Sequence, residues 1–539
     1  MTLDGSRIGA DVLVELLLGR GISVIPTLSG NQIMPLYGRI EAAGIRLIHA
    51  RHEAAAIHIA DAIARLTDSV SVALLTAGPG HANAMGAIYS ARMAQSPVVT
   101  LSGHAERSRL GYGAFQEMDQ TGMAAWVCQG SWTVGAPERL GADFARAWRS
   151  AMSPVPGPTH LSLPADILTA PIPSERRSSS LRFTTRCRAP NGVEVERVLA
   201  LLHGAKRPLI AAGPAWVRGA KAAALAAFTE ITGCSALALE SPRGVNDPSL
   251  GRLAGIVAQA DVIVALGRRF DVGLGFGRPP AVAASCVLAT AGRFDESRPD
   301  RPIAASIDGE PASILDALTI AARNLSWPDW LGWRRDIATE TAVMPDMPSR
   351  SPHAIHPGRL ADIVGRAIGE RDILVVDGGE FGQWAQAVVR RRERVINGPS
   401  GAIGGAVPFA IGARIARPDT RVFAFTGDGA LGYHLAEFET AARNRLPFVC
   451  IVGNDRRWNA EVVIQRRLGG PSLPSLDLDP ARYDLATAAL GGHGERVEDE
   501  CDLGPAIERA IASGKPALID VAIEGLAAPA YNRRGGSHV

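Results

Sequence analysis

The 539-residue sequence has few cysteines, little lysine, no marked excess of either charge and no long apolar run. Its six cysteines are scattered without a CxxC pair or metal-ligand spacing, which argues against a disulfide framework and favours a reducing, cytoplasmic location. The formal net charge of +2 gives no electrostatic reason to expect nucleic acid or an anionic membrane as a partner. No stretch approaches the roughly 18 apolar residues that a membrane span requires.

Lysine is so scarce that it limits the chemistry open to the chain. Only Lys206, Lys221 and Lys515 are present, so a Schiff-base lysine or a phosphate-binding lysine has few candidates. All the other positively charged side chains are arginine. The sequence therefore directs attention to carboxylates, amides and glycines.

The length exceeds what one hydrophobic core can serve, and it suggests about three domains. Two segments near 171–190 and 340–358 are rich in Pro, Ser and Arg and lack a hydrophobic period, as linkers do. They divide the chain into three predicted domains, at 1–175, 190–335 and 355–530.

Every piece alternates short apolar runs with helical patterns, which predicts parallel sheets with helices on both faces. We therefore expect an α/β protein with three doubly wound parallel-sheet domains. Ligands bind such sheets at the carboxyl ends of the strands, where several runs here end in glycine-rich loops. The expected strands are SVIPTL, VSVALLTA, PVVTLSG, PLIAAG, SALALE, DVIVALG, DILVVDGG, RVFAFTGDG, FVCIVGND and ALIDVAI.

The most specific motif lies in the third piece, where the strand VFAF ends in Gly427-Asp428-Gly429 before a helix. Two glycines let the backbone approach a phosphate, and the helix N-terminus offers free N–H groups. Asp428 is suited to a phosphate only if a cation lies between them. The next expected strand ends in Asn454-Asp455, which places a second oxygen ligand beside the first, and Mg²⁺ is the natural cation. The alternative is an ordinary N-cap aspartate.

A Gly-Asp-Gly followed after about 25 residues by Asn-Asn or Asn-Asp resembles the signature of thiamine-diphosphate enzymes. RHEAAAIHIADAIAR, TAGPGHANAM and GAFQEMDQ resemble the acetolactate synthase group, and DGGEFGQW and GYHLAEFETAARNRLP resemble benzaldehyde lyase and its relatives. The resemblance covers almost the whole chain. It implies pyrimidine-binding, central and diphosphate-binding domains in that order.

The resemblance also implies that Glu53 is the catalytic carboxyl group, which exchanges a proton with the pyrimidine ring of the cofactor. The cofactor itself supplies the difficult carbon chemistry. The alternative for Glu53 is a helix-start glutamate that interacts with the helix dipole. Gln116 matches a glutamine near the reacting carbon, and Pro79 in the GPG turn and Asn83 after it are candidates for cofactor binding.

The remaining site residues are implied in the third piece. Asp428, Asp455 and a main-chain carbonyl near Arg457 would ligate Mg²⁺. Ile403 would be the apolar wedge that bends the cofactor, a role to which a stiff β-branched side chain is suited. The residues expected around the diphosphate are Gly427, Asp428, Gly429, Ala430, Asn454 and Asp455, with the loop formed by Glu380, Phe381, Gly382 and Gln383.

Several functional hypotheses remain side by side. The first is an acetolactate synthase-like carboligase or lyase acting on 2-oxo acids. Benzaldehyde lyase-like or 2-hydroxyacyl-CoA lyase-like cleavage competes with it, and a third class is a non-catalytic cofactor-binding subunit. A nicotinamide dehydrogenase is disfavoured, because no strand–GxGxxG–helix unit with a following acidic residue stands out.

Two further expectations come from the resemblance alone. The active sites would lie at a subunit interface of a homodimer or homotetramer, with a small-molecule substrate. Some relatives bind FAD in the central domain, but no motif of this sequence supports FAD here.

The sequence also departs from the group's pattern at two places. The helix after Glu53 lacks the usual Gly-Tyr-Ala-Arg, and Gln129 stands where synthases have lysine, which puts the biosynthetic acetolactate synthase in doubt.

Overall fold

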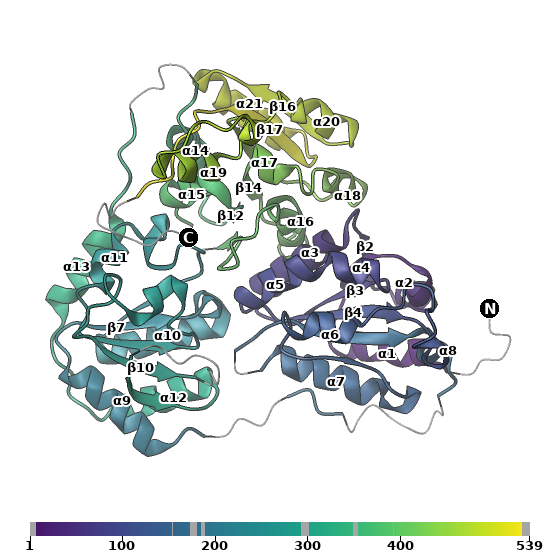
Figure 1. The fold of residues 1–539 in the computed structure, drawn as a ribbon, viewed down its shortest axis with the longest axis horizontal. Helices are drawn as coiled ribbons and strands as arrows, with labels where there is room; N and C mark the ends of the chain where they lie inside the picture. Colours follow the sequence, from purple (N-terminus) through teal and green to yellow (C-terminus); the bar gives the residue numbers. More distant parts are fainter. Residues whose placement is uncertain are drawn as a thin grey trace. The chain divides into compact units, whose positions relative to one another are not determined.

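Three separate parallel sheets form the protein, and each lies in one of the three predicted pieces (Figure 1). The structure is a computed structural model that describes residues 7–153, 155–172, 181–184, 189–292, 301–348, 354–391 and 393–530. By compactness the chain forms two units. Unit 1 comprises residues 1–186, 408–418 and 439–444, and unit 2 comprises 187–407, 419–438 and 445–539. The predicted domain limits stay predictions, and parts of both expected linkers fall outside the described residues.

Unit 1 contains a six-stranded sheet in the order β2-β1-β3-β4-β6-β5, with every pair of strands parallel. The chain starts at β1, adds β2 on one side and β3 on the other, so the direction of winding reverses between β1 and β3. Ligands bind at such a reversal, outside the carboxyl ends of the strands. The strands are β1 Val24–Leu28, β2 Arg46–His49, β3 Ser71–Leu75, β4 Val98–His104, β5 Ser131–Thr133 and β6 Thr159–Pro164.

The sheet of unit 1 is buried on both faces, as its apolar strands predict. Along β3, Val72 and Leu74 belong to the core on one face, and Ala73 and Leu75 belong to the core on the other. Alternating side chains of a strand point to opposite faces, so a continuous apolar run indicates a covered sheet. Helices α1, α2 and α7 share one core, and α3 and α5 share the other.

Unit 1 includes two segments that are distant in sequence, residues 408–418 and 439–444. Residues 408–418, most of α16, pack on α3, because Gly412 lets the two backbones approach closely: an added Cβ would lie 2.5 Å from the carbonyl oxygen of Ile59. The helices are α1 Gly9–Gly19, α2 Met34–Ala42, α3 Glu53–Thr67, α4 Pro79–Asn83, α5 Met85–Met93, α6 Gln120–Ala125, α7 Leu140–Ala151, α8 Ala165–Thr169, α16 Ala406–Ala416 and α18 Glu437–Arg443.

Unit 2 contains the other two sheets. The central sheet has five parallel strands in the order β11-β10-β9-β7-β8. Its strands are β7 Pro208–Ala212, β8 Ser235–Ala238, β9 Val262–Leu266, β10 Val287–Ala291 and β11 Ile303–Ile307. Its helices are α9 Gly192–Gly204, α10 Gly219–Thr232, α11 Leu253–Val257, α12 Pro311–Ala322 and α13 Leu331–Ala342.

The third sheet has six parallel strands in the order β13-β12-β14-β15-β17-β16, so its winding reverses between β12 and β14. The strands are β12 Ile373–Val376, β13 Arg394–Ile396, β14 Val422–Gly427, β15 Val449–Asn454, β16 His493–Val497 and β17 Ala517–Ala522. The helices are α14 Pro357–Ala367, α15 Gly379–Val388, α17 Asp428–Leu431, α19 Asn459–Arg467, α20 Tyr483–Ala489 and α21 Leu503–Ala512.

The α/β class with three doubly wound parallel sheets is thus confirmed. Within the described ranges, no helix has the length and apolar character needed to cross a membrane.

Candidate active site

Two carboxyl groups meet at the carboxyl edge of the third sheet, as the motif predicts. β14 and β15 are paired in register up to Gly427 and Gly453, so Asp428 and Asp455 leave neighbouring strand ends together. Burial raises the pKa of Asp428 to about 6. Burial raises the pKa of Asp455 to about 7, and the negative charge of Asp428 adds to this rise. Both rises in pKa mean that the surrounding residues do not fully stabilise the ionised carboxylates.

This arrangement fits a small divalent cation. A cation between the two carboxylates would relieve their repulsion, and oxygen ligands are those that Mg²⁺ prefers. Among the described residues, no group of three or more His, Cys, Asp and Glu side chains could hold a metal ion, so other oxygens must complete the coordination. The ligand role of the Arg457 carbonyl stays a prediction.

Asn454 contributes to the shape of this loop. Its Nδ2 donates to Oδ1 of Asp520 at 2.8 Å, and its Oδ1 accepts from the backbone N–H of Arg456 at 3.3 Å. Arg456 has a φ of +57°, a conformation that needs such support in a residue with a side chain. Asn454 therefore fixes the turn that presents Asp455.

Open space for an anion lies beside two glycines at the point where the winding reverses. A Cβ added at Gly427 or at Gly379 would meet nothing within 4 Å, and Gly379 begins the ten-residue helix α15 with a φ of +80°. Gly429 is enclosed instead, because its Cβ would lie 2.9 Å from the indole of Trp458. Ala430 follows it, buried in α17. Glycine backbone and a helix N-terminus beside a cation site suit a diphosphate.

The expected loop at 380–383 is wrong, because these residues form the first turn of α15. Glu380 is already engaged: its Oε1 pairs with Nη2 of Arg243 at 3.1 Å, and its Oε2 accepts from the backbone N–H of Ala528. Phe381 packs in the core, 6.0 Å from the ring centre of Phe425. One face of α15 covers the sheet, which places Phe381 in the core. Glu380, the neighbouring residue, is left to contact Arg243 and Ala528 instead.

Gln383 differs from these two neighbours. Its side chain is buried, and its Oε1 has no hydrogen-bond partner among the described residues. A buried amide oxygen without a partner is costly, so it has capacity for a ligand or water. Cofactor binding by Glu380, Phe381 and Gln383 stays a prediction.

The loop that carries Ile403 is held on both sides of this residue. Asn397 Nδ2 donates to the carbonyl of Ala402 at 3.0 Å, and the N–H of Gly404 donates to Oδ1 of Asp377 at 2.9 Å. Ile403 is half-buried, and a Cβ at Gly378 would lie 2.8 Å from its Cγ2. These contacts place the loop that carries Ile403 at the reversal between β12 and β14, and its role as a wedge stays a prediction.

In unit 1, Glu53 is the first residue of α3 and is buried. Its Oε2 accepts a hydrogen bond from Nδ2 of Asn83 at 3.0 Å. Its Oε1 lies where a Cβ at Gly80 would be only 2.8 Å away. The structure therefore brings Glu53 to the GPG turn, although 30 residues separate Asn83 from it.

Gln116 lies on the other side of the same turn. It is half-buried with a φ of +59°, and its carbonyl oxygen would be 2.5 Å from a Cβ at Gly78. Pro79 is exposed at the start of α4. Glu53, Asn83, Gln116 and Pro79 thus gather at the carboxyl edge of the unit 1 sheet, and their roles toward a cofactor stay predictions.

Gln120 is a residue that the sequence analysis missed. It is buried, its Oε1 accepts from the N–H of Gly78 at 2.7 Å, and its Nε2 donates to the carbonyl of Gly103 at 3.0 Å. It joins the loop after β3 to strand β4. No local pattern distinguishes it from Gln116, four residues earlier.

The glycine-rich loop after β9, Val272–Gly277, is packed on itself. Asp271 accepts from the N–H of Gly273 and pairs with Arg268, and a Cβ at Gly244 would lie 2.2 Å from Gly273. The geometry of this loop gives no support for FAD.

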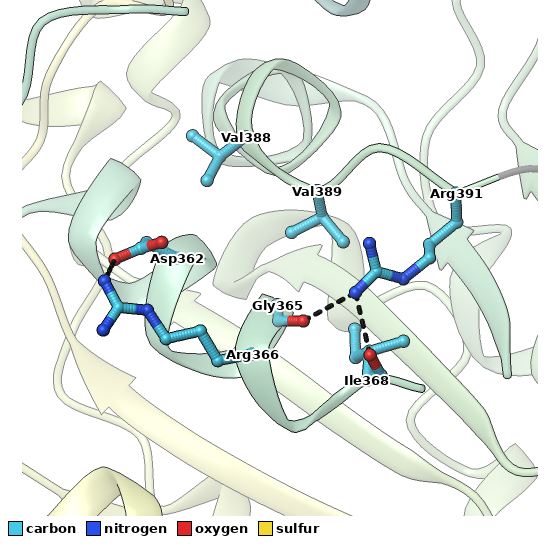
Figure 2. A pocket seen from close by; sticks show the side chains of 7 residues that line it. All are labelled: Asp362, Gly365, Arg366, Ile368, Val388, Val389 and Arg391. Carbon is cyan, nitrogen blue, oxygen red and sulfur yellow. Dashed lines mark hydrogen bonds and ion pairs between the residues drawn. The ribbon is translucent and has the colours of Figure 1, made fainter. Parts of the chain in front are cut away.

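A cavity of ≈ 340 Å³ lies elsewhere, between α14 and α15 (Figure 2). Arg366 pairs with Asp362 at 2.6 Å, and Nη2 of Arg391 donates to the carbonyls of Gly365 and Ile368. α14 ends just before β12 begins, so the cavity lies at the amino edge of the sheet. Arg366 is already ion-paired and Arg391 already donates to two carbonyls, and the cavity is remote from the edge that carries the two aspartates.

Comparisons with known proteins agree with this geometry. The model of the N-terminal TPP (thiamine pyrophosphate, the same compound as thiamine diphosphate) binding domain of thiamine pyrophosphate enzymes matches residues 7–123. The model of their C-terminal TPP binding domain matches residues 377–521. The first match contains Glu53 and Asn83, and the second contains Asp428 and Asp455.

Full-length relatives are also found. The chain is 33% identical to a probable acetolactate synthase of Mycobacterium bovis, over 97% of this chain and 96% of the relative. It is 30% identical to human 2-hydroxyacyl-CoA lyase 2, over 90% of this chain and 85% of the relative. The crystal structure of benzoylformate decarboxylase from Polynucleobacter necessarius matches with a TM-score of 0.82 at 18% identity, covering 97% of this chain and 100% of that one, which shows a shared fold. The chain belongs to the thiamine pyrophosphate enzyme family, and it is an enzyme of the transferase or carbon–carbon lyase type.

Proposed function

We propose that this protein is a thiamine diphosphate- and Mg²⁺-dependent carboligase or lyase that acts on 2-oxo acids in the manner of an acetolactate synthase. The observation that carries the proposal is the pair Asp428 and Asp455, two carboxyl groups with raised pKa values beside the open space at Gly427. A cation would stabilise the ionised form of such a pair, and a cation beside a helix N-terminus suits an anion such as a diphosphate.

The residues of the two units would have different roles. Asp428 and Asp455 would ligate Mg²⁺, and the backbone at Gly427 and Gly429 would approach the diphosphate. When bound, the cofactor would supply the nucleophilic carbon that attacks or releases a carbonyl group. Glu53 would hold or release a proton at the cofactor's pyrimidine ring.

The subunit arrangement belongs to the same proposal. Glu53 lies in unit 1 and Asp428 in unit 2. We expect a homodimer or homotetramer in which the active sites form at a subunit interface. Sedimentation at several protein concentrations would test it, and a monomer that turns over substrate would contradict it.

Cleavage of a 2-hydroxy carbonyl compound is the second candidate, in the manner of benzaldehyde lyase or 2-hydroxyacyl-CoA lyase. Similarity to human 2-hydroxyacyl-CoA lyase 2 over 90% of the chain favours it. A non-catalytic cofactor-binding subunit is a third candidate class. The buried, hydrogen-bonded carboxyl group of Glu53 argues against this third class, because cofactor binding alone does not require a carboxylate at that position.

The test is product analysis by NMR. Purified protein is incubated with thiamine diphosphate, Mg²⁺ and pyruvate, with and without benzaldehyde, alongside Glu53→Gln. A parallel reaction contains a 2-hydroxyacyl-CoA. Acetolactate or a mixed hydroxyketone from the wild type, absent with Glu53→Gln, would support the carboligase. Cleavage of only the acyl-CoA would replace it with the lyase, and equal behaviour of both proteins would contradict an enzymatic role for Glu53.

A further inference from the structure

The carboxylate of Glu53 is held by a single side-chain donor. Asn83 Nδ2 donates to Oε2 of Glu53 at 3.0 Å, whereas Oε1 receives no hydrogen bond from the described residues. Glu53 is buried on α3, and Asn83 is exposed at the end of α4. The amide therefore distinguishes the two oxygens and leaves Oε1 free for a proton.

The rotamer of Glu53 depends on the absence of a side chain at Gly80. A Cβ there would lie 2.8 Å from Oε1 of Glu53 and 2.5 Å from Cγ2 of Thr76. Real Cβ atoms do not approach a neighbour so closely, so either neighbour would have to move. Helix α4 thus supplies both the donor, Asn83 at its end, and the space at Gly80 that the carboxylate needs.

A buried network fixes α4 from its other side. Gly78, with a φ of +55°, donates its N–H to Oε1 of Gln120 at 2.7 Å. The ring of His81 lies 2.9 Å from Oγ of Ser102 and 3.1 Å from the carbonyl of Gln120. These groups are buried, so breaking their hydrogen bonds would leave polar atoms without water. The network makes α4 a rigid support for Asn83.

We propose that Asn83 is a positioning residue that orients Glu53, and that Gln120 and His81 hold the helix turn on which Asn83 acts. This inference rests on the proposed function and replaces the expectation that Asn83 binds the cofactor directly. An N–H donor favours the ionised carboxylate and fixes which oxygen faces a proton partner. Asn83 would thus act on proton exchange rather than on affinity for the cofactor.

The test separates these two effects with Asn83→Ala and Asn83→Asp in the full-length protein. Affinity for thiamine diphosphate in the presence of Mg²⁺ is measured by calorimetry. Exchange of the C2 proton of bound thiamine diphosphate is measured in D₂O by acid quench and NMR. Glu53→Gln, the double variant Glu53→Gln/Asn83→Ala and the exposed control Asn324→Ala are treated in the same way. Thermal unfolding of each variant shows whether it folds.

Positioning predicts a specific pattern. Asn83→Ala should bind the cofactor within about threefold of the wild type and slow the exchange about tenfold, which corresponds to ~1.4 kcal/mol. Asn83→Asp should slow it at least as much, because like charges then face each other. The double variant should be no slower than Glu53→Gln, since Asn83 acts through that residue.

Three results would overturn the inference. Weaker cofactor binding by Asn83→Ala with unchanged exchange would make Asn83 a cofactor ligand, and unchanged values for both would leave it without a role. Additive losses in the double variant would show that it acts apart from Glu53. A wild type that neither binds nor exchanges would refute the proposed function itself, which is a distinguishable outcome.

Discussion

Buried carboxyl groups are stabilised in different ways in this protein. Glu53 accepts from a neutral amide, and Glu380 is paired with Arg243. Asp428 and Asp455 instead leave neighbouring strand ends, and burial raises the pKa values of both. An ionised group without a compensating charge is costly in a buried setting, so the last pair gains most from a cation.

Asp455→Asn should therefore weaken Mg²⁺ binding. The substitution keeps the shape and an oxygen ligand but removes one negative charge, so we expect the Kd for Mg²⁺ to rise about tenfold. Calorimetric titration in the presence of thiamine diphosphate checks this. Asp419→Asn, an exposed change in the turn before β14, is the control and should leave the Kd unchanged. Equal affinity of both variants would show that the negative charge of Asp455 does not contribute to Mg²⁺ binding.

Gly80→Ala should impair the enzyme because its Cβ would displace Glu53 or Thr76. We expect turnover to fall at least about tenfold and stability to fall by about 1–3 kcal/mol. Gly86→Ala is the matched control, since its Cβ meets nothing within 4 Å in helix α5. It should keep activity and gain up to ~1 kcal/mol from helix propensity. Steady-state kinetics and urea unfolding decide between these outcomes.

The buried ring of His81 should make the free energy of unfolding depend on pH. Burial lowers its pKa to about 4 from an ordinary value of 6.5. Between these values the unfolded chain binds the proton and the folded chain does not, so stability falls as pH falls from 6.5 toward 4. At pH 5 this corresponds to a loss of ~2 kcal/mol relative to pH 7.5.

His81→Asn removes this titration. Urea unfolding at pH 7.5 and pH 5.0 should show a smaller loss of stability for His81→Asn than for the wild type. Neutral asparagine loses some hydrogen bonding at both pH values, so the comparison is the difference between pH values within each protein. An unchanged difference would show that His81 stays neutral in the unfolded chain as well, or charges in both states.

At the scale of elements, the packing of α16 on α3 depends on one glycine. A Cβ at Gly412 would lie 2.5 Å from the carbonyl oxygen of Ile59 and 2.8 Å from Cβ of Ala62. Both atoms belong to a rigid helix, so the helices would have to separate. A close backbone approach of this kind explains why a segment far along the chain joins unit 1.

Gly412→Ala should therefore destabilise the protein by about 1–3 kcal/mol, in spite of the better helix propensity of alanine. Gly38→Ala, in α2 with nothing within 4 Å, should stabilise it by up to ~1 kcal/mol. Thermal and urea unfolding compare the two. A stabilising Gly412→Ala would show that α16 and α3 separate without cost.

At the scale of the whole molecule, unit 2 joins two sheets through ion pairs. Arg243 pairs with Glu380, and Arg394 pairs with Glu240 at 2.5 Å. Glu380 also accepts from the backbone of Ala528 in the C-terminal segment. One carboxylate thus connects the central piece, helix α15 and the end of the described chain.

Arg243→Met should destabilise unit 2 by about 3 kcal/mol, because it leaves the buried carboxylate of Glu380 without its cation. Glu380→Gln should cost less, since the amide oxygen can still accept while no charge is left unpaired. Urea unfolding gives both values. A Glu380→Gln variant less stable than Arg243→Met would contradict this ranking.

Much of the fold was predictable, because it depends on short-range patterns. All ten expected strands are present, since each contains a short apolar run of the kind that indicates a strand. Five of the strands that the sequence analysis missed, β2, β5, β11, β13 and β16, lie at sheet edges. An edge strand has only one neighbour, so its sequence can be short or polar. The loop expected at 380–383 failed because a glycine pair suits a helix start as well as a loop.

The sequence by itself determined the class of fold, the family and the placement of Asp428, Asp455 and Glu53 at strand ends and helix starts. Those features follow from local periodicity, from glycine and from motif spacing. Only the tertiary structure decided that Asn83 holds Glu53, that Gln120 fixes the turn beneath it and that Glu380 is already engaged by Arg243 and Ala528. These contacts join residues 30 to 148 positions apart, and which of many polar side chains meet is set by the packing of whole elements.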